Sequence, residues 1–133
     1  MDYDLRGTGQ SILLPEGWHT LYVVDITIET SSKGNEMWVI TTEEFESGSV
    51  DKTYAVTNKK TGWVFSSFLK ACGYKRNAQG IYKDIEPENC IGRSVEGQNK
   101  VEENEFTRRD GEIIKEMRNK FVTFRAAKEK ATL

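Results

Sequence analysis

The sequence predicts an all-β domain of five strands with one helix, and three observations support this prediction. Residues 17–28 and 36–45 are rich in the β-branched and aromatic side chains that favour strands. Residues 63–72 have apolar side chains at helical spacing, and Gly73 follows them as a natural helix stop. Clusters of turn-forming residues separate the predicted elements.

The first two predicted strands are long and are joined by a polar turn over residues 30–35. The first strand places His19, Leu21 and Val23 on one face, so both of its faces can be partly buried. The other face carries Trp18, Thr20, Tyr22, Val24, Ile26 and Ile28. Strands of roughly ten residues exceed the usual five or six. Such long, two-sided strands suit a curved, closing sheet.

The middle of the chain supplies a third strand and the helix. Residues 50–56 alternate well enough to form the strand. On the helix, Phe65 and Phe68 fall on the apolar stripe and are expected in the core. Cys72 is expected to be buried on the same stripe. Residues 86–90 are expected to add one helical turn.

The last third of the chain has the weakest pattern. Between residues 93 and 106, Val95 and Val101 are the main strand signals. Residues 110–111, Asp-Gly, favour a hairpin turn. The final strand is clearest at residues 120–124.

The chain is interpreted as one domain. At 133 residues it can build a single core. Residues 15–125 form that domain, residues 1–14 are expected to be a loose leader or short edge segment, and residues 126–133 are expected to be a short tail of mixed charge.

Composition excludes several classes of protein. No apolar run approaches the ~20 residues needed to span a membrane, and the acidic N-terminus lacks the layout of a secretory signal. Two cysteines and one histidine, His19, provide neither a disulfide framework nor a zinc pattern. We therefore expect a cytoplasmic protein with reduced thiols and with no cofactor or metal.

The order of three strands, one helix and two strands is the layout of the OB-fold, a five-stranded Greek-key barrel. That fold binds ligands on strands two and three and on the loops that follow strands one and four. Here those loops are residues 31–35 and 107–111, and both carry basic residues.

Charge is distributed unevenly along the chain, although the net charge is only −2. This net charge argues against nucleic-acid binding through bulk positive charge. However, the span from Lys52 to Lys83 holds seven basic residues and no acid. Tyr54, Trp63 and other aromatic residues lie among them. Cations for phosphates and rings for bases are the components of a single-strand binding surface.

Each of these residues also has a purely structural interpretation. Alternation with Ile40 and Thr42 favours the core for Trp38. Tyr54 and Trp63 remain open between core and surface, because strand faces are not fixed by one sequence. Any single lysine fits a solvated face.

The sequence carries no catalytic motif. Acidic clusters at residues 43–51 and 102–105 lack a supporting histidine or metal motif and are interpreted as solvated surface. His19 is interpreted as a packed or hydrogen-bonded residue. We therefore expect a binding protein rather than an enzyme.

Several short motifs, taken in order, resemble a family of small phage and prophage proteins long catalogued as a domain of unknown function. They run from residue 13 to about residue 125: Leu14-Pro15-Glu16-Gly17, Ser32-Lys33-Gly34-Asn35 with Met37-Trp38, Phe68-Leu69-Lys70-Ala71-Cys72-Gly73, Ile91-Gly92-Arg93-Ser94-Val95 and Arg118-Asn119-Lys120-Phe121-Val122-Thr123-Phe124. The resemblance implies an OB-fold protein that binds single-stranded DNA in phage replication and recombination, in the cytoplasm of a bacterial host. It also implies phage recombination or replication proteins as partners. One departure is that residues 126–133 lack the acidic tip by which many single-strand binders recruit such partners.

These arguments lead to one expected function with a defined set of residues. We expect binding of single-stranded DNA without strong sequence preference, and we leave a homo-oligomer open. The expected phosphate contacts are Lys33, Lys52, Lys59, Lys60, Arg108 and Arg109, and the expected stacking residues are Trp38, Tyr54 and Trp63. The alternative is an OB-fold protein-interaction module that binds no nucleic acid.

Overall fold

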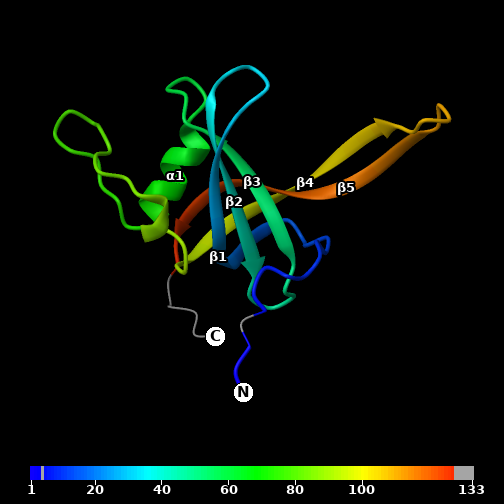
Figure 1. The fold of residues 1–133 in the computed structure, drawn as a ribbon, viewed down its shortest axis with the longest axis horizontal. Helices are drawn as coiled ribbons and strands as arrows, with labels where there is room; N and C mark the ends of the chain where they lie inside the picture. Colours follow the sequence, from blue (N-terminus) through cyan, green and yellow to red (C-terminus); the bar gives the residue numbers. More distant parts are fainter. Residues whose placement is uncertain (4, 128–133) are drawn as a thin grey trace.

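Five antiparallel strands form one sheet in the computed structural model, which describes residues 1–3 and 5–127 (Figure 1). The strands are β1 (Gly17–Thr30), β2 (Glu36–Glu44), β3 (Val50–Val56), β4 (Ser94–Thr107) and β5 (Ile113–Ala126). Their order in the sheet is β3-β2-β1-β4-β5. The helix α1 (Trp63–Ala71) lies between β3 and β4 in the chain, and a single 3₁₀ turn follows at Pro87–Asn89. The predicted all-β class and the position of the helix are confirmed.

A bulge in β1 decides which side chains of this strand enter the core. Leu21 and Val23 are fully buried, as alternation from the strand start requires. The pairing of β1 with β2 then shifts register between Val23 and Asp25. The extra residue brings Ile26 to the buried side, because it reverses the alternation. The predicted placement of Ile26 on the face of Trp18 and Tyr22 is therefore wrong.

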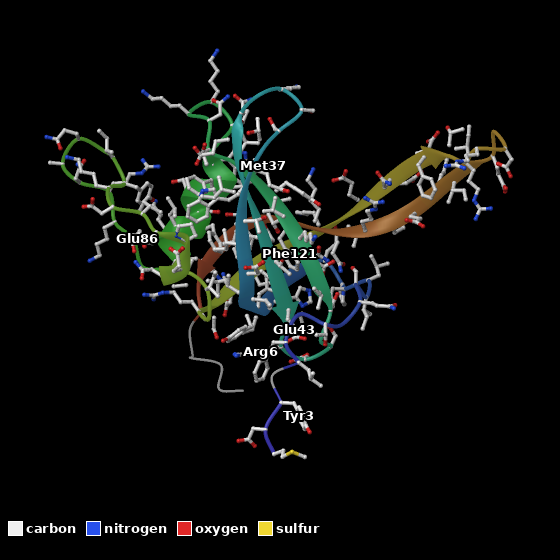
Figure 2. The ribbon with its side chains drawn as sticks, viewed as in Figure 1. Tyr3, Arg6, Met37, Glu43, Glu86 and Phe121 are labelled. Carbon is white, nitrogen blue, oxygen red and sulfur yellow. The ribbon has the colours of Figure 1, made fainter. Side chains whose placement is uncertain are left out.

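The core lies between the sheet and α1. Phe68 of α1 is fully buried and meets Phe124 of β5 edge to face, with ring centroids 5.3 Å apart. Gly97 of β4 lies so close to this cluster that a Cβ there would come within 2.8 Å of Phe121. Figure 2 shows Phe121 in the middle of the body of the protein. The burial of Phe68 and of Cys72 confirms the helical stripe expected from the sequence.

The two cysteines lie together in this core and are both free thiols. Cys72 follows the last residue of α1, and Cys90 follows the 3₁₀ turn. A hydrogen bond with Cys90, together with burial, raises the pKa of the Cys72 thiol. Cys72 therefore stays protonated at neutral pH and acts as a small apolar core residue.

The sheet does not close into the expected barrel through backbone pairing, since β3 and β5 are its two edges. Side chains link β5 to α1 and to β3 instead. At one end the hydroxyl oxygen of Ser67 in α1 accepts a hydrogen bond of 3.1 Å from the backbone N–H of Phe124 in β5. At the other end Asn119 of β5 donates to the carboxylate of Asp51 in β3, at 3.2 and 3.3 Å.

The segment before β1 covers the second of these ends. Asn119 donates from its amide nitrogen to the carbonyl of Ile12 at 2.7 Å and accepts from the backbone N–H of Leu14 at 2.8 Å. Leu14 is buried in the core. The sequence predicts a loose leader or a short edge segment over residues 1–14, and residues 10–14 are held against both edges of the sheet.

The outer half of the β4–β5 hairpin projects far from the body as an arm (Figure 1). Side chains stand free on both sides of this arm in Figure 2. β4 has nearly the bounds of the weak strand signal over residues 93–106, whereas β5 extends well beyond its clearest stretch at residues 120–124. The arm buries little apolar surface and so carries no hydrophobic alternation. The arm carries cross-strand ion pairs instead. In one of them, the ammonium nitrogen of Lys115 lies 3.7 Å from a carboxylate oxygen of Glu103. The turn at residues 110–111 is confirmed.

Three further expectations concern the ends of the chain and its helical segments. The helical turn predicted over residues 86–90 is confirmed as the 3₁₀ turn. Among the described residues, no helix is long and apolar enough to cross a membrane. The expected tail lies outside the described residues from position 128 onward.

Candidate functional site

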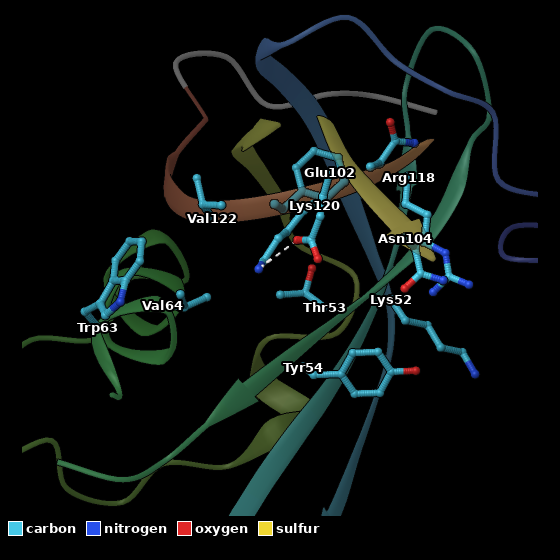
Figure 3. A pocket seen from close by; sticks show the side chains of 12 residues that line it. Lys52, Thr53, Tyr54, Trp63, Val64, Glu102, Asn104, Arg118, Lys120 and Val122 are labelled. Atoms are coloured by element: carbon cyan, nitrogen blue, oxygen red, sulfur yellow. Dashed lines mark ion pairs between the residues drawn. The ribbon is translucent and has the colours of Figure 1, made fainter. Parts of the chain in front are cut away.

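A groove opens where the two edges of the sheet face each other without pairing. It has a volume of about 600 Å³ and is bounded by β3, β5, the start of α1 and the inner part of the arm. We call it the seam groove. Its lining residues are Lys52, Thr53, Tyr54, Trp63, Val64, Glu102, Asn104, Arg118, Asn119, Lys120, Phe121 and Val122 (Figure 3).

Two exposed aromatic side chains stand at the walls of the seam groove. Tyr54 is on the outer face of β3 and is 60% exposed, because alternation on this strand sends Thr53 and Ala55 inward. Trp63 is the first residue of α1 and is also 60% exposed. Figure 3 shows Trp63 on one side of the groove and Tyr54 beside Lys52 on the other. Large rings that are exposed to this extent leave faces on which a planar group can stack.

Three cations and one acid supply the charge of the groove. Lys52 extends from β3, opposite Thr41 of β2. Arg118 and Lys120 are two residues apart on β5 and therefore point to the same side of that strand. Lys120 pairs with Glu102 of β4, with 2.8 Å between the ammonium nitrogen and a carboxylate oxygen. Arg118 is also paired, with Glu116 of β5 at 3.9 Å. The three cations still outnumber the one acid that lines the groove, which favours an anionic ligand.

The groove also contains a polar group without a partner. Thr53 is only 7% exposed, yet within the described part of the chain its hydroxyl oxygen makes no hydrogen bond. Its side chain lies below the Lys120–Glu102 pair in the view of Figure 3. A buried hydroxyl usually has a partner, because an unmet one costs roughly 1–3 kcal/mol. The hydroxyl oxygen of Thr53 is itself shielded from solvent, so Thr53 forms part of the inner wall of the groove rather than an open contact for a ligand.

A second, wider groove lies on the other side of Trp63. It has a volume of about 840 Å³ and runs between the β3–α1 loop, α1 and the loop after α1. We call it the loop groove. Lys59, Lys60 and Arg76 line it together with the aromatic rings of Phe65 and Tyr82 and several aliphatic side chains. Because Trp63 lines both grooves, the two form a path across the start of α1.

Arg76 is held in place in the loop groove. Its guanidinium donates to the hydroxyl of Ser66 at 2.9 Å. The same group lies over the ring of Tyr82, 5.5 Å from the ring centroid. Fixing a guanidinium beforehand reduces the entropy lost when it binds an anion.

Six of the nine residues expected from the sequence line these grooves. Lys52 and Tyr54 line the seam groove, Trp38, Lys59 and Lys60 line the loop groove, and Trp63 lines both. The question that the sequence left open for Tyr54 and Trp63 is answered in favour of the surface.

Trp38 requires a correction. It is only 3% exposed and packs against Phe65, with ring centroids 4.8 Å apart. It reaches the loop groove with an edge at most, so it offers no free ring face to a base. The alternation of Trp38 with Ile40, which favoured the core, was the stronger signal.

The three remaining cations lie away from the seam groove. Lys33 is exposed in the β1–β2 turn, at the end of the sheet from which the β3–α1 loop leaves. Arg108 and Arg109 are exposed at the tip of the arm, far from the body in Figure 1. Arg108 pairs there with Glu112 at 3.7 Å rather than with the glutamates of β4. The structure therefore does not bring the arm arginines together with the basic span.

Sequence reasoning missed Thr53, Glu102, Arg118 and Lys120 as groove residues. A weak signal existed on β5, where Arg118, Lys120 and Val122 alternate with Phe121 and share one side of the strand. No sequence signal placed β5 beside β3, because these strands are far apart in the chain and do not pair.

No family model matches this chain, and no curated protein matches it significantly. The functional argument therefore depends on the residues themselves.

Proposed function

We propose that this chain binds single-stranded DNA without strong sequence preference, in a path formed by the seam groove and the loop groove. The observation that carries the proposal is that two exposed rings, Tyr54 and Trp63, lie together with six cations along one path. Rings that accept any base and cations that follow the phosphates are the components of sequence-tolerant single-strand binding.

We also propose that the domain is an OB-fold in which side chains complete the barrel. The strand order is β3-β2-β1-β4-β5, so pairing of the edge strands β3 and β5 would close the sheet into a five-stranded barrel. The helix α1 lies between β3 and β4 in the chain. Ligands of this fold bind on strands two and three and on the adjoining loops. Lys52 and Tyr54 on the outer face of β3 meet that rule.

The resemblance to phage and prophage proteins suggests the biological setting. On this proposal the protein is a non-enzymatic binder that protects single strands or presents them to phage replication or recombination proteins in the host cytoplasm. Stacking contributes about 1–3 kcal/mol per base, which lets such a protein tolerate a net charge of −2.

One observation favours the alternative of a protein-interaction module. Ile28 and Ile81 are exposed at the loop groove, and Ile113 and Met117 are exposed on the arm. Exposed aliphatic side chains of this kind also suit a protein partner. Salt separates the two functions, because phosphate contacts weaken steeply with salt and apolar contacts do not.

The test is a fluorescence anisotropy titration with a labelled oligo-dT at two salt concentrations. We expect binding with a steep salt slope, and weaker binding to a duplex of the same length. Tyr54→Ala and Trp63→Ala should each weaken binding by about 1–3 kcal/mol, which corresponds to roughly 5- to 150-fold.

Tyr3→Ala is the matched control. Tyr3 is an exposed tyrosine near the N-terminus that lines neither groove, so its removal should leave affinity unchanged. Equal or tighter binding to the duplex, or equal losses in all three variants, would contradict the proposal.

A further inference from the structure

Glu102 is an unexpected residue for an anion-binding groove. It lines the seam groove from β4 and holds Lys120 at 2.8 Å, midway between the walls that carry Trp63 and Tyr54 (Figure 3). Of the three cations in that groove, Lys120 is the one whose charge is already met by an acid of the same groove. A phosphate that binds Lys120 must therefore share its ammonium group with the carboxylate or replace the carboxylate.

Building on the proposed function, we propose that Glu102 sets the strength and salt dependence of binding by competing with phosphate for Lys120. A strand that enters the groove exchanges one anion for another at this lysine. The gain from that phosphate is therefore small, and the bound strand also brings its phosphate close to a second negative charge.

This exchange changes how much of the binding free energy comes from the bases. A bare polyanion gains little from Lys120, whereas a strand with bases gains stacking on Tyr54 and Trp63 as well. Glu102 lowers the electrostatic part of the binding free energy for both kinds of ligand. Stacking therefore makes up a larger share of the total for a strand that has bases.

The counterion balance gives a direct way to measure the exchange. A phosphate contact in single-stranded DNA contributes a salt slope of about 0.7. This slope measures the counterions that DNA releases on binding. When the phosphate displaces Glu102, the freed carboxylate takes up a cation, which offsets part of that release of counterions. Removing the charge of Glu102 should therefore steepen the slope, an effect that a purely structural residue does not produce.

The chain provides a closely matched control for this residue. Glu103 is the next residue on β4 and pairs with Lys115 of β5 at 3.7 Å, as Glu102 pairs with Lys120. Both pairs are exposed, but Glu103 points to the opposite side of the arm and does not line the groove. Glu102→Gln and Glu103→Gln therefore make the same change in net charge and each break one exposed ion pair.

The experiment compares these two variants with the unchanged protein on two probes of equal length. One probe is oligo-dT, and the other is an abasic deoxyribose-phosphate oligomer that keeps the phosphates and lacks the bases. At low salt, E102Q should bind both probes about fivefold more tightly, the factor for one interaction of two unit charges near 4 Å in water. Its salt slope on oligo-dT should rise by up to about 0.7.

E103Q should change affinity by less than about twofold and leave the slope unchanged. When Lys120→Gln is also present, the gain in binding free energy from E102Q should be less than half of its value in the protein that keeps Lys120. The reason is that the competition acts through this lysine. Thermal melts of all variants check that each one folds; exposed pairs of this kind contribute only about 0–1 kcal/mol.

Each outcome assigns success or failure to a separate claim. If oligo-dT binding depends on Tyr54 and Trp63 but E102Q behaves like E103Q, the competition is refuted and the proposed function survives. If the unchanged protein does not bind oligo-dT but E102Q binds the abasic probe better than E103Q does, the exchange holds and the DNA function fails. Oligo-dC serves as a third probe. If E102Q lowers the affinity for oligo-dC relative to the affinity for oligo-dT, Glu102 reads the bases and the proposal is overturned. If none of the proteins binds either probe, both claims fall.

Discussion

Asn119 offers the clearest stability prediction, because one side chain joins both edges of the sheet to the N-terminal segment. Its amide donates to Asp51 of β3 and to the carbonyl of Ile12, and its oxygen accepts from Leu14 and from the side chain of Asn99. Asn119→Ala removes all of these contacts. Net hydrogen-bond contributions of about 1 kcal/mol each, which are not fully additive, give an expected loss of roughly 2–4 kcal/mol. For a domain of this size the melting temperature should fall by about 10 °C.

Asn104→Ala is the matched control for this loss. Asn104 is on β4, partly exposed, and makes no side-chain hydrogen bond within the described part of the chain. Asn104→Ala should lower the free energy of unfolding by less than about 0.5 kcal/mol. Urea unfolding followed by circular dichroism measures both variants. If Asn119→Ala loses no more stability than Asn104→Ala, side chains do not close the seam, and the account of the N-terminal segment is wrong as well.

Three further predictions concern Glu44, Gly97 and the arginines at the tip of the arm. Burial raises the pKa of Glu44. Hydrogen bonds of 2.9 Å from the backbone of the β2–β3 turn and the electrostatic effect of His19 lower this pKa by more than burial raises it, so the net shift is downward. The unfolded chain therefore binds the proton more tightly. The contribution of ionised Glu44 to the free energy of unfolding is fully present above the ordinary carboxyl pKa of about 4.3. It is lost as the pH falls through the lowered pKa of the folded protein. Thermal melts across that range should show a flatter acid limb for Glu44→Gln. Gly97→Ala should destabilise by about 1–3 kcal/mol in urea unfolding, since its Cβ meets the core side chains of β1 and β5; an unchanged midpoint would contradict the packing described for the core. Alanine at both Arg108 and Arg109 should leave the melting temperature nearly unchanged and should lower the salt slope by about 1.4 only for oligonucleotides long enough to reach the tip; an unchanged slope at every length removes the arm from the site.

Local patterns in the sequence predicted the elements that bury an apolar face. The start of α1 at Trp63, the bounds of β3 and the burial of Phe68 follow from side-chain spacing that any single helix or strand displays. The arm is different. Its strands are held by hairpin pairing and cross-strand ion pairs, so residues 101–118 carry little hydrophobic alternation and only a weak strand signal.

The candidate site was predictable only in part, for the same reason. The sequence by itself determined an acid-free span from Lys52 to Lys83 with aromatic residues among its cations, and an order of elements that suits a small barrel. Tertiary structure alone decided which side chains face one another. It buried Trp38 against Phe65, separated the arm arginines from the basic span, and brought Lys120 and Glu102 of the hairpin across from Tyr54 of β3. These outcomes depend on a bulge in β1, on the twist of the sheet and on two edges that approach without backbone pairing, and such long-range geometry leaves no periodic trace in the chain.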